Sequence, residues 1–305
     1  MGGIAKFVDE KRKLVERLGR KLSGASVSKA LKDGHAKRRP RPCGLTVHTG
    51  VGCSFACIYC YIYDMGFTSA AKPYPLSAAE LAYAVASNPY VALGKEGLML
   101  AFGSVTEPFL PETYRKAIEY LEAASGLGNP SQFSTKQALS LEQAREVKKA
   151  NSNASALVTI VTLKKARVLE PLAPTPAERV KTIANLSKAG LHTCLFLRPV
   201  IPGLTEKEAR DILEAAASSG AAGVVLGSLR VTERIANALL KLGMDVRGRV
   251  PRWPKGREQL AVASRDLKEK VEREAQRLGL EVFKSACAAN IQAHELSCYA
   301  CAMGP

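Results

Sequence analysis

The feature that most constrains the fold is an alternation of short apolar runs and helical segments after residue 42. Six runs have the length and composition of buried strands. The expected strands are Leu45–Thr49, Leu98–Phe102, Gln132–Ser134, Ala156–Leu163, His192–Leu197 and Gly223–Leu226. Because strands that alternate with helices form parallel sheets with right-handed crossovers, this pattern predicts an α/β fold.

Capping signals mark the expected helix starts between these strands. Four Ser or Thr residues precede a Glu or Gln at capping-box spacing. The pairs are Ser77 with Glu80, Ser140 with Gln143, Thr175 with Glu178 and Thr205 with Glu208. Six strand–helix units are fewer than a closed (β/α)8 barrel needs. We therefore predict a partial (β/α)6 barrel whose ligands collect at the carboxyl ends of the strands.

Two extensions flank the predicted barrel. Residues 1–42 are expected to form a basic helical N-terminal extension and linker, and residues 43–230 the barrel. Residues 231–305 are expected to form a C-terminal extension, with a long helix over Gln259–Leu278 and a returning segment at Glu281–Lys284 that would bring the tail near the barrel mouth. No run of eighteen apolar residues and no secretory signal is present, so we expect a cytoplasmic protein and no membrane association.

The charge balance is strongly basic, with a formal net charge of +16 at pH 7. Cations dominate the first 41 residues, and a second basic group surrounds Trp253. The second group consists of Lys241, Arg247, Arg249, Arg252, Lys255 and Arg257. Such a field favours polyanionic partners, above all nucleic acid, whose bases stack on aromatic rings. The alternatives are solubility charge for the cations and a loop anchor for the tryptophan.

Three cysteines directly follow the first expected strand. Cys53, Cys57 and Cys60 have C-x3-C-x2-C spacing, which suits the thiolate ligands of an iron–sulfur cluster. Three protein ligands leave one iron of a 4Fe-4S cubane open. Structural zinc requires four ligands, usually in paired knuckles, and no second pair lies nearby. We therefore predict a 4Fe-4S cluster at the barrel mouth.

With this loop placed on a partial barrel, the sequence resembles the radical-SAM superfamily, and within it the spore photoproduct lyase-like branch. The similar segments are Gly52–Tyr61, Gly103–Pro108, Ser134–Lys136, Glu170–Arg179 and Arg198–Leu204. The resemblance implies an enzyme that binds S-adenosylmethionine (SAM) at the open iron and cleaves it reductively to a 5′-deoxyadenosyl radical. It also implies an electron donor such as ferredoxin or flavodoxin.

The resemblance further implies roles for cofactor-binding residues. Tyr59 would shield the cluster from water, Glu107 would bind the SAM ammonium group, and Lys136 would pair with the SAM carboxylate. A surface ion pair is the alternative for Glu107 and Lys136.

Further roles follow for the later strands. Thr159 would bond the ribose or methionine part of SAM, the backbone around Ile201 would flank adenine, and Arg198 would contact SAM or a phosphate. The photoproduct lyases use a cysteine thiol as hydrogen donor near the end of the second strand. Ser104 or a neighbour fills that place here, so repair of the spore lesion is not expected.

A second cysteine group lies in the tail. Cys287, Cys298 and Cys301 have C-x10-C-x2-C spacing, with His294 between them. We predict a second iron–sulfur cluster at these cysteines. The alternatives are zinc held by the three cysteines and His294, and cysteines without a metal.

Together these features predict a radical-SAM enzyme that modifies nucleic acid, with RNA favoured. No catalytic residue is assigned. The alternatives are a radical-SAM enzyme acting on a protein or small molecule, and a metal-stabilised nucleic-acid-binding module without turnover.

Overall fold

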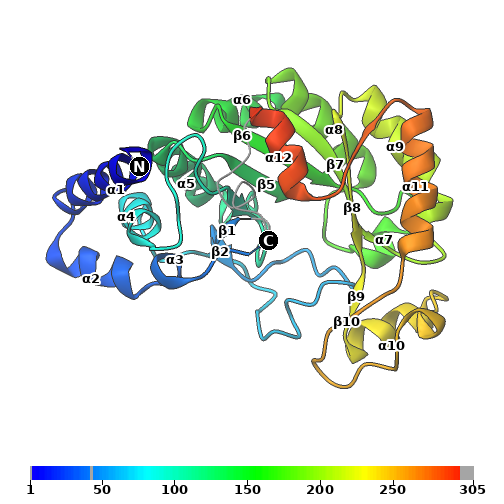
Figure 1. The fold of residues 1–305 in the computed structure, drawn as a ribbon. Coiled ribbons are helices and arrows are strands. Elements are labelled where there is room, and N and C mark those ends of the chain that lie inside the picture. Colours follow the sequence, from blue (N-terminus) through cyan, green and yellow to red (C-terminus); the bar gives the residue numbers. More distant parts are fainter. Residues whose placement is uncertain (1, 42–43, 296–305) are drawn as a thin grey trace.

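A twisted parallel sheet forms the centre of the protein in the computed structural model, which describes residues 2–41 and 44–295 (Figure 1). The strand order within these residues is β1-β4-β5-β6-β7-β8-β11, and all neighbours pair in parallel. The strands are β1 (Leu45–Val47), β4 (Leu100–Phe102), β5 (Ser131–Thr135), β6 (Ala154–Thr159), β7 (His192–Val200), β8 (Gly223–Ser228) and β11 (Glu281–Phe283). The predicted partial barrel is confirmed, and β11 adds a seventh strand beyond the six predicted ones.

At least one helix lies between each pair of consecutive strands of this sheet, as a parallel connection requires. The barrel helices are α4 (Ala78–Ser87), α5 (Tyr114–Leu127), α6 (Leu141–Ala150), α8 (Pro176–Lys188), α9 (Ala209–Ser218) and α11 (Arg265–Arg277). Shorter elements are α7 (Ala166–Leu169), η1 (Thr205–Lys207), α10 (Glu233–Lys241), η2 (Arg247–Arg249) and α12 (Ala286–His294). Two antiparallel pairs lie outside the main sheet, β2 (Gly50–Val51) with β3 (Lys72–Pro73) and β9 (Arg230–Val231) with β10 (Leu260–Ala261).

Three of the four predicted capping boxes are present, at the starts of α4, α6 and α8. The fourth is wrong. Thr205 begins the 3-10 helix η1, and the buried Glu208 carboxylate accepts hydrogen bonds from Thr162 Oγ1 and from two backbone N–H groups after β6. The predicted helix over 259–278 also starts later, at Arg265, because Leu260 and Ala261 pair with β9.

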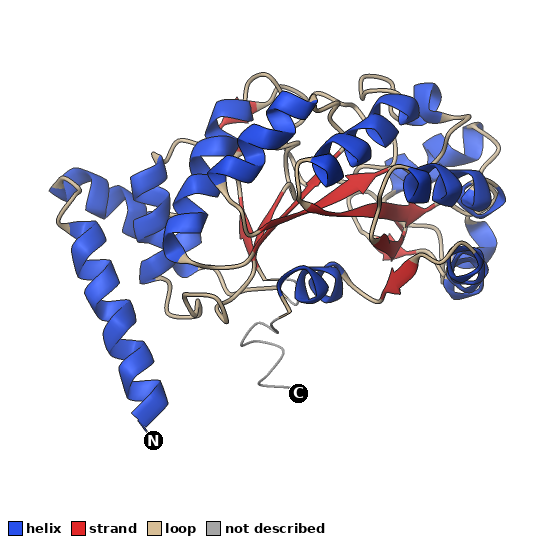
Figure 2. Cartoon of the chain, turned by 90° about the horizontal axis from the view of Figure 1, so that it is seen from above, coloured by secondary structure: helices blue, strands red, loops and turns tan. Residues whose placement is uncertain are grey.

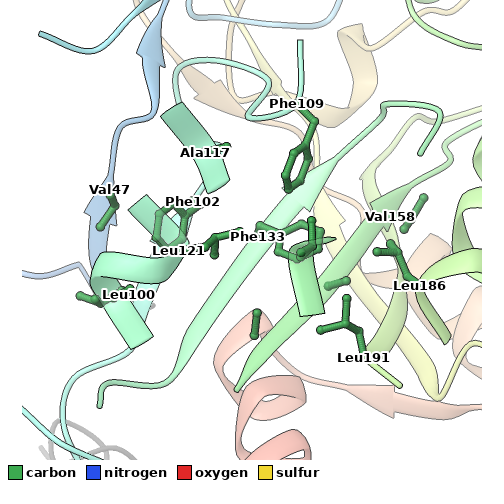
Figure 3. Close-up of a cluster of buried hydrophobic side chains, with 14 of the residues drawn as sticks. Val47, Leu100, Phe102, Phe109, Ala117, Leu121, Phe133, Val158, Leu186 and Leu191 are labelled. Atoms are coloured by element: carbon green, nitrogen blue, oxygen red, sulfur yellow. The ribbon is translucent and has the colours of Figure 1, made fainter. Parts of the chain in front are cut away.

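The main core lies between the sheet and the helices on its outer face. Figure 3 shows Phe102 and Phe133 from neighbouring strands packed against Leu121 of α5. Leu186 of α8 and Val158 of β6 continue this layer. Burying a side chain of this size contributes about 1.5–3 kcal/mol, so this layer supplies much of the stability of the scaffold.

Helix α12 covers the inner face of the sheet, opposite the other barrel helices (Figure 2). Ala289 packs with Leu157 and Cys194, and Asn290 Nδ2 donates to Ser155 Oγ at 2.9 Å. Ser155 lies near the amino end of β6. The expectation that the tail reaches the barrel mouth is therefore wrong for residues 286–294, because α12 fills the opposite end of the barrel.

The N-terminal extension consists of α1 (Gly2–Gly19), α2 (Gly24–Lys32) and α3 (Gly34–Lys37), which pack against α4. The first residues of α1 project away from the body (Figure 2). Some of its cations are structural, since Lys11 Nζ donates to the carbonyl oxygens of Asn88 and Val91 at 2.6 and 2.7 Å. No helix of the described residues is long and apolar enough to cross a membrane.

A buried ion pair anchors the loop between α7 and α8. Arg179 of α8 lies 2.6 Å from the Glu170 carboxylate, and both side chains are completely buried. Arg179 also donates to the carbonyl oxygens of Pro174 and Thr159 at 2.8 and 3.1 Å. These contacts join α8, the loop and the carboxyl end of β6 into one unit.

We expect Arg179→Met to lower the free energy of unfolding by about 3–5 kcal/mol, because it leaves the Glu170 carboxylate buried without its cation. Chemical denaturation measures this loss. Arg210→Met is the matched control, since Arg210 and Glu214 form an exposed pair on α9, and it should have little effect. Equal stability of the two variants would contradict the structural role of the buried pair.

Candidate active site

The three cysteines of the C-x3-C-x2-C loop line one pocket at the carboxyl ends of the strands. The pocket has an empty volume of about 530 Å³, and its walls include the turn after β4, the end of β5 and Thr159 of β6. The structure brings together most of the residues predicted for the site. These are Cys53, Cys57, Tyr59, Cys60, Glu107, Lys136 and Thr159.

Backbone contacts explain why this loop requires glycine at its start. Gly52 has a φ of +83°, and a Cβ placed there would lie 2.5 Å from the Ala70 carbonyl oxygen. The Cys53 N–H donates to the Thr68 carbonyl oxygen at 3.2 Å. Tyr63 completes the fold of the loop, because its hydroxyl donates to the Cys53 carbonyl oxygen and accepts from the Ala56 N–H.

Arg234 of α10 binds the outer side of the cysteine loop, and no pattern in the sequence predicted this role. Its guanidinium donates to the carbonyl oxygens of Cys60 and Ile58 at 2.6 and 3.2 Å. It also forms an ion pair with Asp64 at 2.7 Å. The C-terminal segment around α10 therefore helps to position the cysteines, although it lies 174 residues from Cys60 in sequence.

The electrostatics of the pocket combine buried thiols with a cation. Burial raises the pKa of the Cys57 thiol to about 12, an effect that Lys136 partly offsets. Burial pulls the pKa of Lys136 down, but the Cys57 thiolate and Glu170 outweigh it, so this pKa lies above its usual value. Lys136 Nζ also lies 5.7 Å from the centre of the Tyr59 ring. A positive charge is thus held next to the cysteines.

Tyr59 connects the cysteine loop to the buried ion pair. Its hydroxyl donates to the Glu170 carboxylate, and its side chain is buried. Burial and the neighbouring Glu170 raise the pKa of Tyr59, so the hydroxyl keeps its proton. The predicted shielding position next to the cysteines is consistent with this burial.

Glu107 lies on the turn that follows β4. Its carboxylate accepts hydrogen bonds from Thr135 Oγ1 at 2.6 Å, from the Lys136 N–H at 2.9 Å and from the Phe109 N–H at 3.3 Å. Burial raises the pKa of Glu107, and these donors partly offset the effect. A carboxylate has about four acceptor sites, so Glu107 has capacity for a further donor in the pocket.

The remaining two predicted cofactor residues do not line this pocket. Arg198 is an exposed side chain at the end of β7 that lies against Gly227, where a Cβ would approach its Cδ to 2.4 Å. Ile201 is fully buried in an apolar cluster with Leu204 and Val161. Ile201 therefore belongs to the apolar cluster that also contains Phe55 and Cys57 of the cysteine loop, and the Arg198 guanidinium lies 5.9 Å from the centre of the Phe196 ring.

Three of the six cations of the second basic group form ion pairs within the described residues. Arg247 and Arg249 form ion pairs with Asp245 and Asp266 at 2.6 and 2.8 Å, and Arg252 forms an ion pair with Glu258. A paired guanidinium has fewer donors left for phosphates, so these three arginines are less available to a polyanion than their number suggests.

The tail cysteines are only partly described. Cys287 is buried on α12, whereas Cys298 and Cys301 lie outside the described residues. His294 is seven positions after Cys287, so both lie on one face of the helix. The Nε2 atom of His294 is buried without a hydrogen-bond partner among the described residues, and burial lowers the pKa of His294. Within residues 2–41 and 44–295, no three His, Cys, Asp or Glu side chains are arranged as ligands of one metal ion.

Solved structures with the same fold include spore photoproduct lyases. A lyase variant with bound AdoMet and dinucleoside spore photoproduct has a TM-score of 0.64 at 13% identity, covering 78% of this chain and 75% of the lyase chain. A lyase complexed with dinucleoside spore photoproduct has a TM-score of 0.62 at 14% identity, covering 77% and 74%. These likenesses establish the fold.

Two viral proteins are similar in sequence. The uncharacterized protein ORF301 of Acidianus two-tailed virus is 24% identical over 194 residues, and a radical SAM Nalpha-GlyT isomerase of Pseudomonas phage M6 is 27% identical over 191 residues. The alignments cover 59% and 60% of this chain, but only 60% and 39% of the two relatives. The signature of the Radical SAM superfamily matches residues 47–216, more than half of the chain, and the protein therefore belongs to this superfamily of enzymes.

Proposed function

We propose that this protein cleaves SAM reductively at a 4Fe-4S cluster and uses that chemistry to modify a nucleic acid, with RNA as the first substrate class to test. The observation that carries the proposal is the convergence of three thiols, a cation and a carboxylate in one pocket at the strand ends. Superfamily membership implies the cluster and SAM. Superfamily membership does not fix the substrate, so the nucleic-acid proposal depends on other observations.

The residues of the pocket fit a cluster held by Cys53, Cys57 and Cys60. Thiolates are the usual ligands of such clusters. Because each thiolate binds a different iron atom of the cluster, the three cysteines surround a wider space than the ligands of a single metal ion do. Lys136 offsets part of the negative charge that the thiolates bring into a buried site. When bound, the cluster and SAM supply the reductive cleavage that defines the superfamily.

Three further residues would bind SAM. Lys136 carries an ammonium group without an ion pair among the described residues, so its donors are available for the SAM carboxylate. Glu107 retains acceptor capacity for the SAM ammonium group. Thr159 lies at the pocket wall and would bond the ribose or methionine part.

Two observations support a nucleic-acid substrate. The lyases of the same fold bind a dinucleoside. In this chain, Arg198 is exposed near the carboxyl end of β7 without an acidic partner among the described residues, and it would pair with a phosphate. Ser104 lines the pocket where the resemblance places the hydrogen-donating cysteine of the lyases, so we propose a different reaction on the nucleic acid.

Cys57→Ala tests the cluster site. Two remaining thiolates cannot hold the cubane, so we expect loss of its iron and sulfide, about four of each per chain, and no formation of 5′-deoxyadenosine after anaerobic reconstitution. Cys194→Ala is the control, because Cys194 is buried in β7 beneath α12 and should leave the iron content unchanged. Retained 5′-deoxyadenosine formation by Cys57→Ala would overturn the assignment.

Nucleoside analysis tests the substrate class. RNA and DNA incubated with the reconstituted enzyme, SAM and dithionite should yield a new nucleoside by mass spectrometry, and Cys57→Ala should yield none. Arg198→Gln should weaken nucleic-acid binding and lower its salt dependence, while SAM cleavage without substrate persists. If no nucleoside changes in either polymer, the nucleic-acid proposal fails and a protein or small molecule becomes the substrate to seek.

We also propose a second metal centre held by Cys287, Cys298 and Cys301, an iron–sulfur cluster with zinc as the alternative. The support in the described residues is the buried Cys287 and the unpartnered Nε2 of His294 on the same helix face. A buried polar atom without a partner is costly unless a ligand satisfies it.

Metal analysis of the double variant Cys298→Ala/Cys301→Ala tests this centre. If both sites are cubanes, iron should fall from about eight to about four per chain, while 5′-deoxyadenosine formation without substrate continues. A loss of zinc with unchanged iron would establish the alternative. If neither metal changes, these cysteines hold no metal.

A further inference from the structure

We propose that the surface formed by residues 164–174, here called the α7 ridge, is the docking site of a small acidic protein that delivers one electron at a time to the cluster. The inference rests on the proposed function and adds a location and a partner class to it. The ridge comprises α7 and the loop that Glu170 and Arg179 anchor.

The α7 ridge contacts the cysteine loop directly through the backbone. The Ile58 N–H, next in sequence to Cys57, donates to the Leu169 carbonyl oxygen at 2.8 Å. The Leu172 N–H approaches the Phe55 carbonyl oxygen at 3.4 Å. The rate of electron transfer falls steeply with distance, so an electron carrier must dock where little protein covers the cluster. A carrier seated on this ridge would be separated from Cys57 by a single layer of chain.

The exposed side of the ridge has the apolar character of a transient interface. Leu172 is 66% exposed and Val168 is 44% exposed, whereas most large apolar side chains of the described residues are buried. Grooves flank the ridge on both sides. One reaches from Leu172 to Leu110 and Phe55, and the other runs past Arg167. Electron-transfer complexes use small interfaces, which this ridge and its grooves can supply.

The charge of the ridge selects an acidic partner. Lys164, Lys165 and Arg167 are exposed, and none forms a side-chain ion pair within the described residues. The acids that line the grooves are Glu112, Glu170 and Glu178. Glu170 is paired with Arg179, and Glu178 is bonded to Thr175 at the start of α8. Opposite charge steers association of the carrier and fixes its orientation.

The proposed electron transfer involves only the carrier and the cluster. The reduced carrier, a flavin or iron–sulfur protein, is oxidised by one electron, and the cluster is reduced by one electron. No proton or chemical group passes between the two proteins at this step. The ridge therefore needs no reactive side chain, only contact and charge.

The test compares two reductants on the reconstituted full chain. In Lys164→Glu/Lys165→Glu/Arg167→Glu, we expect SAM cleavage driven by reduced flavodoxin or ferredoxin at low salt to fall roughly tenfold or more. Cleavage driven by dithionite and the iron content should stay as in the unmodified chain. Leu172→Ser, which changes no charge, should also lower the carrier-driven rate alone.

The matched control reverses three exposed charges elsewhere. Lys149 of α6 and Lys270 and Arg273 of α11 are exposed, and no ion pair involves them within the described residues. Their joint change to Glu alters the net charge equally, so the carrier-driven rate should change much less than in the ridge variant.

Three results would overturn the inference. The first is that reduced flavodoxin and reduced ferredoxin each drive SAM cleavage by the triple ridge variant as fast as by the unmodified chain. The second is an equal loss with dithionite. The third is lost nucleic-acid modification with intact carrier-driven SAM cleavage, which would assign the ridge to the substrate. If the unmodified chain cleaves no SAM even with dithionite, the proposed function itself fails.

Discussion

The site depends on charge compensation at the mouth of an apolar barrel. Thiolates and the Glu170 carboxylate cannot be buried together unless cations accompany them. Lys136 lies beside Cys57, and Arg179 pairs with Glu170. Tyr59 joins the two halves, since its hydroxyl bonds Glu170 and its ring faces Lys136. The cysteine loop, the end of β5 and the start of α8 are therefore held in one electrostatic unit.

Parallel topology brings this unit together from distant parts of the chain. Each strand ends at the same edge of the sheet, so the turns after β1, β4 and β5 meet although they are far apart in sequence. Arg234 adds a contact from beyond β8, where α10 reaches back to the carbonyl oxygen of Cys60. The scaffold thus fixes the cysteines from the inside through the sheet and from the outside through α10.

Local patterns predicted most of the barrel, because strand composition and capping boxes act over a few residues. They failed where a distant partner decides the outcome. Glu208 has capping-box spacing from Thr205, but it bonds the chain after β6 instead. The position of α12 depends on the hydrogen bond from Asn290 to Ser155 on β6. The role of Arg234 depends on its contact with a loop that is far away in sequence. The convergence of the three cysteines in one pocket was predictable because they lie within eight residues of the chain.

The cysteine loop also separates two surfaces with different tasks in our proposals. Phe55 lines both the inner pocket and the groove beside Leu172, so one turn of chain has the pocket on one side and the α7 ridge on the other. An electron can cross this turn, whereas a substrate cannot. A carrier on the ridge would therefore leave the pocket side of the loop, and Arg198 near the end of β7, open to a substrate. Reduction and substrate binding need not compete for the same surface, because the loop that would hold the cluster lies between them.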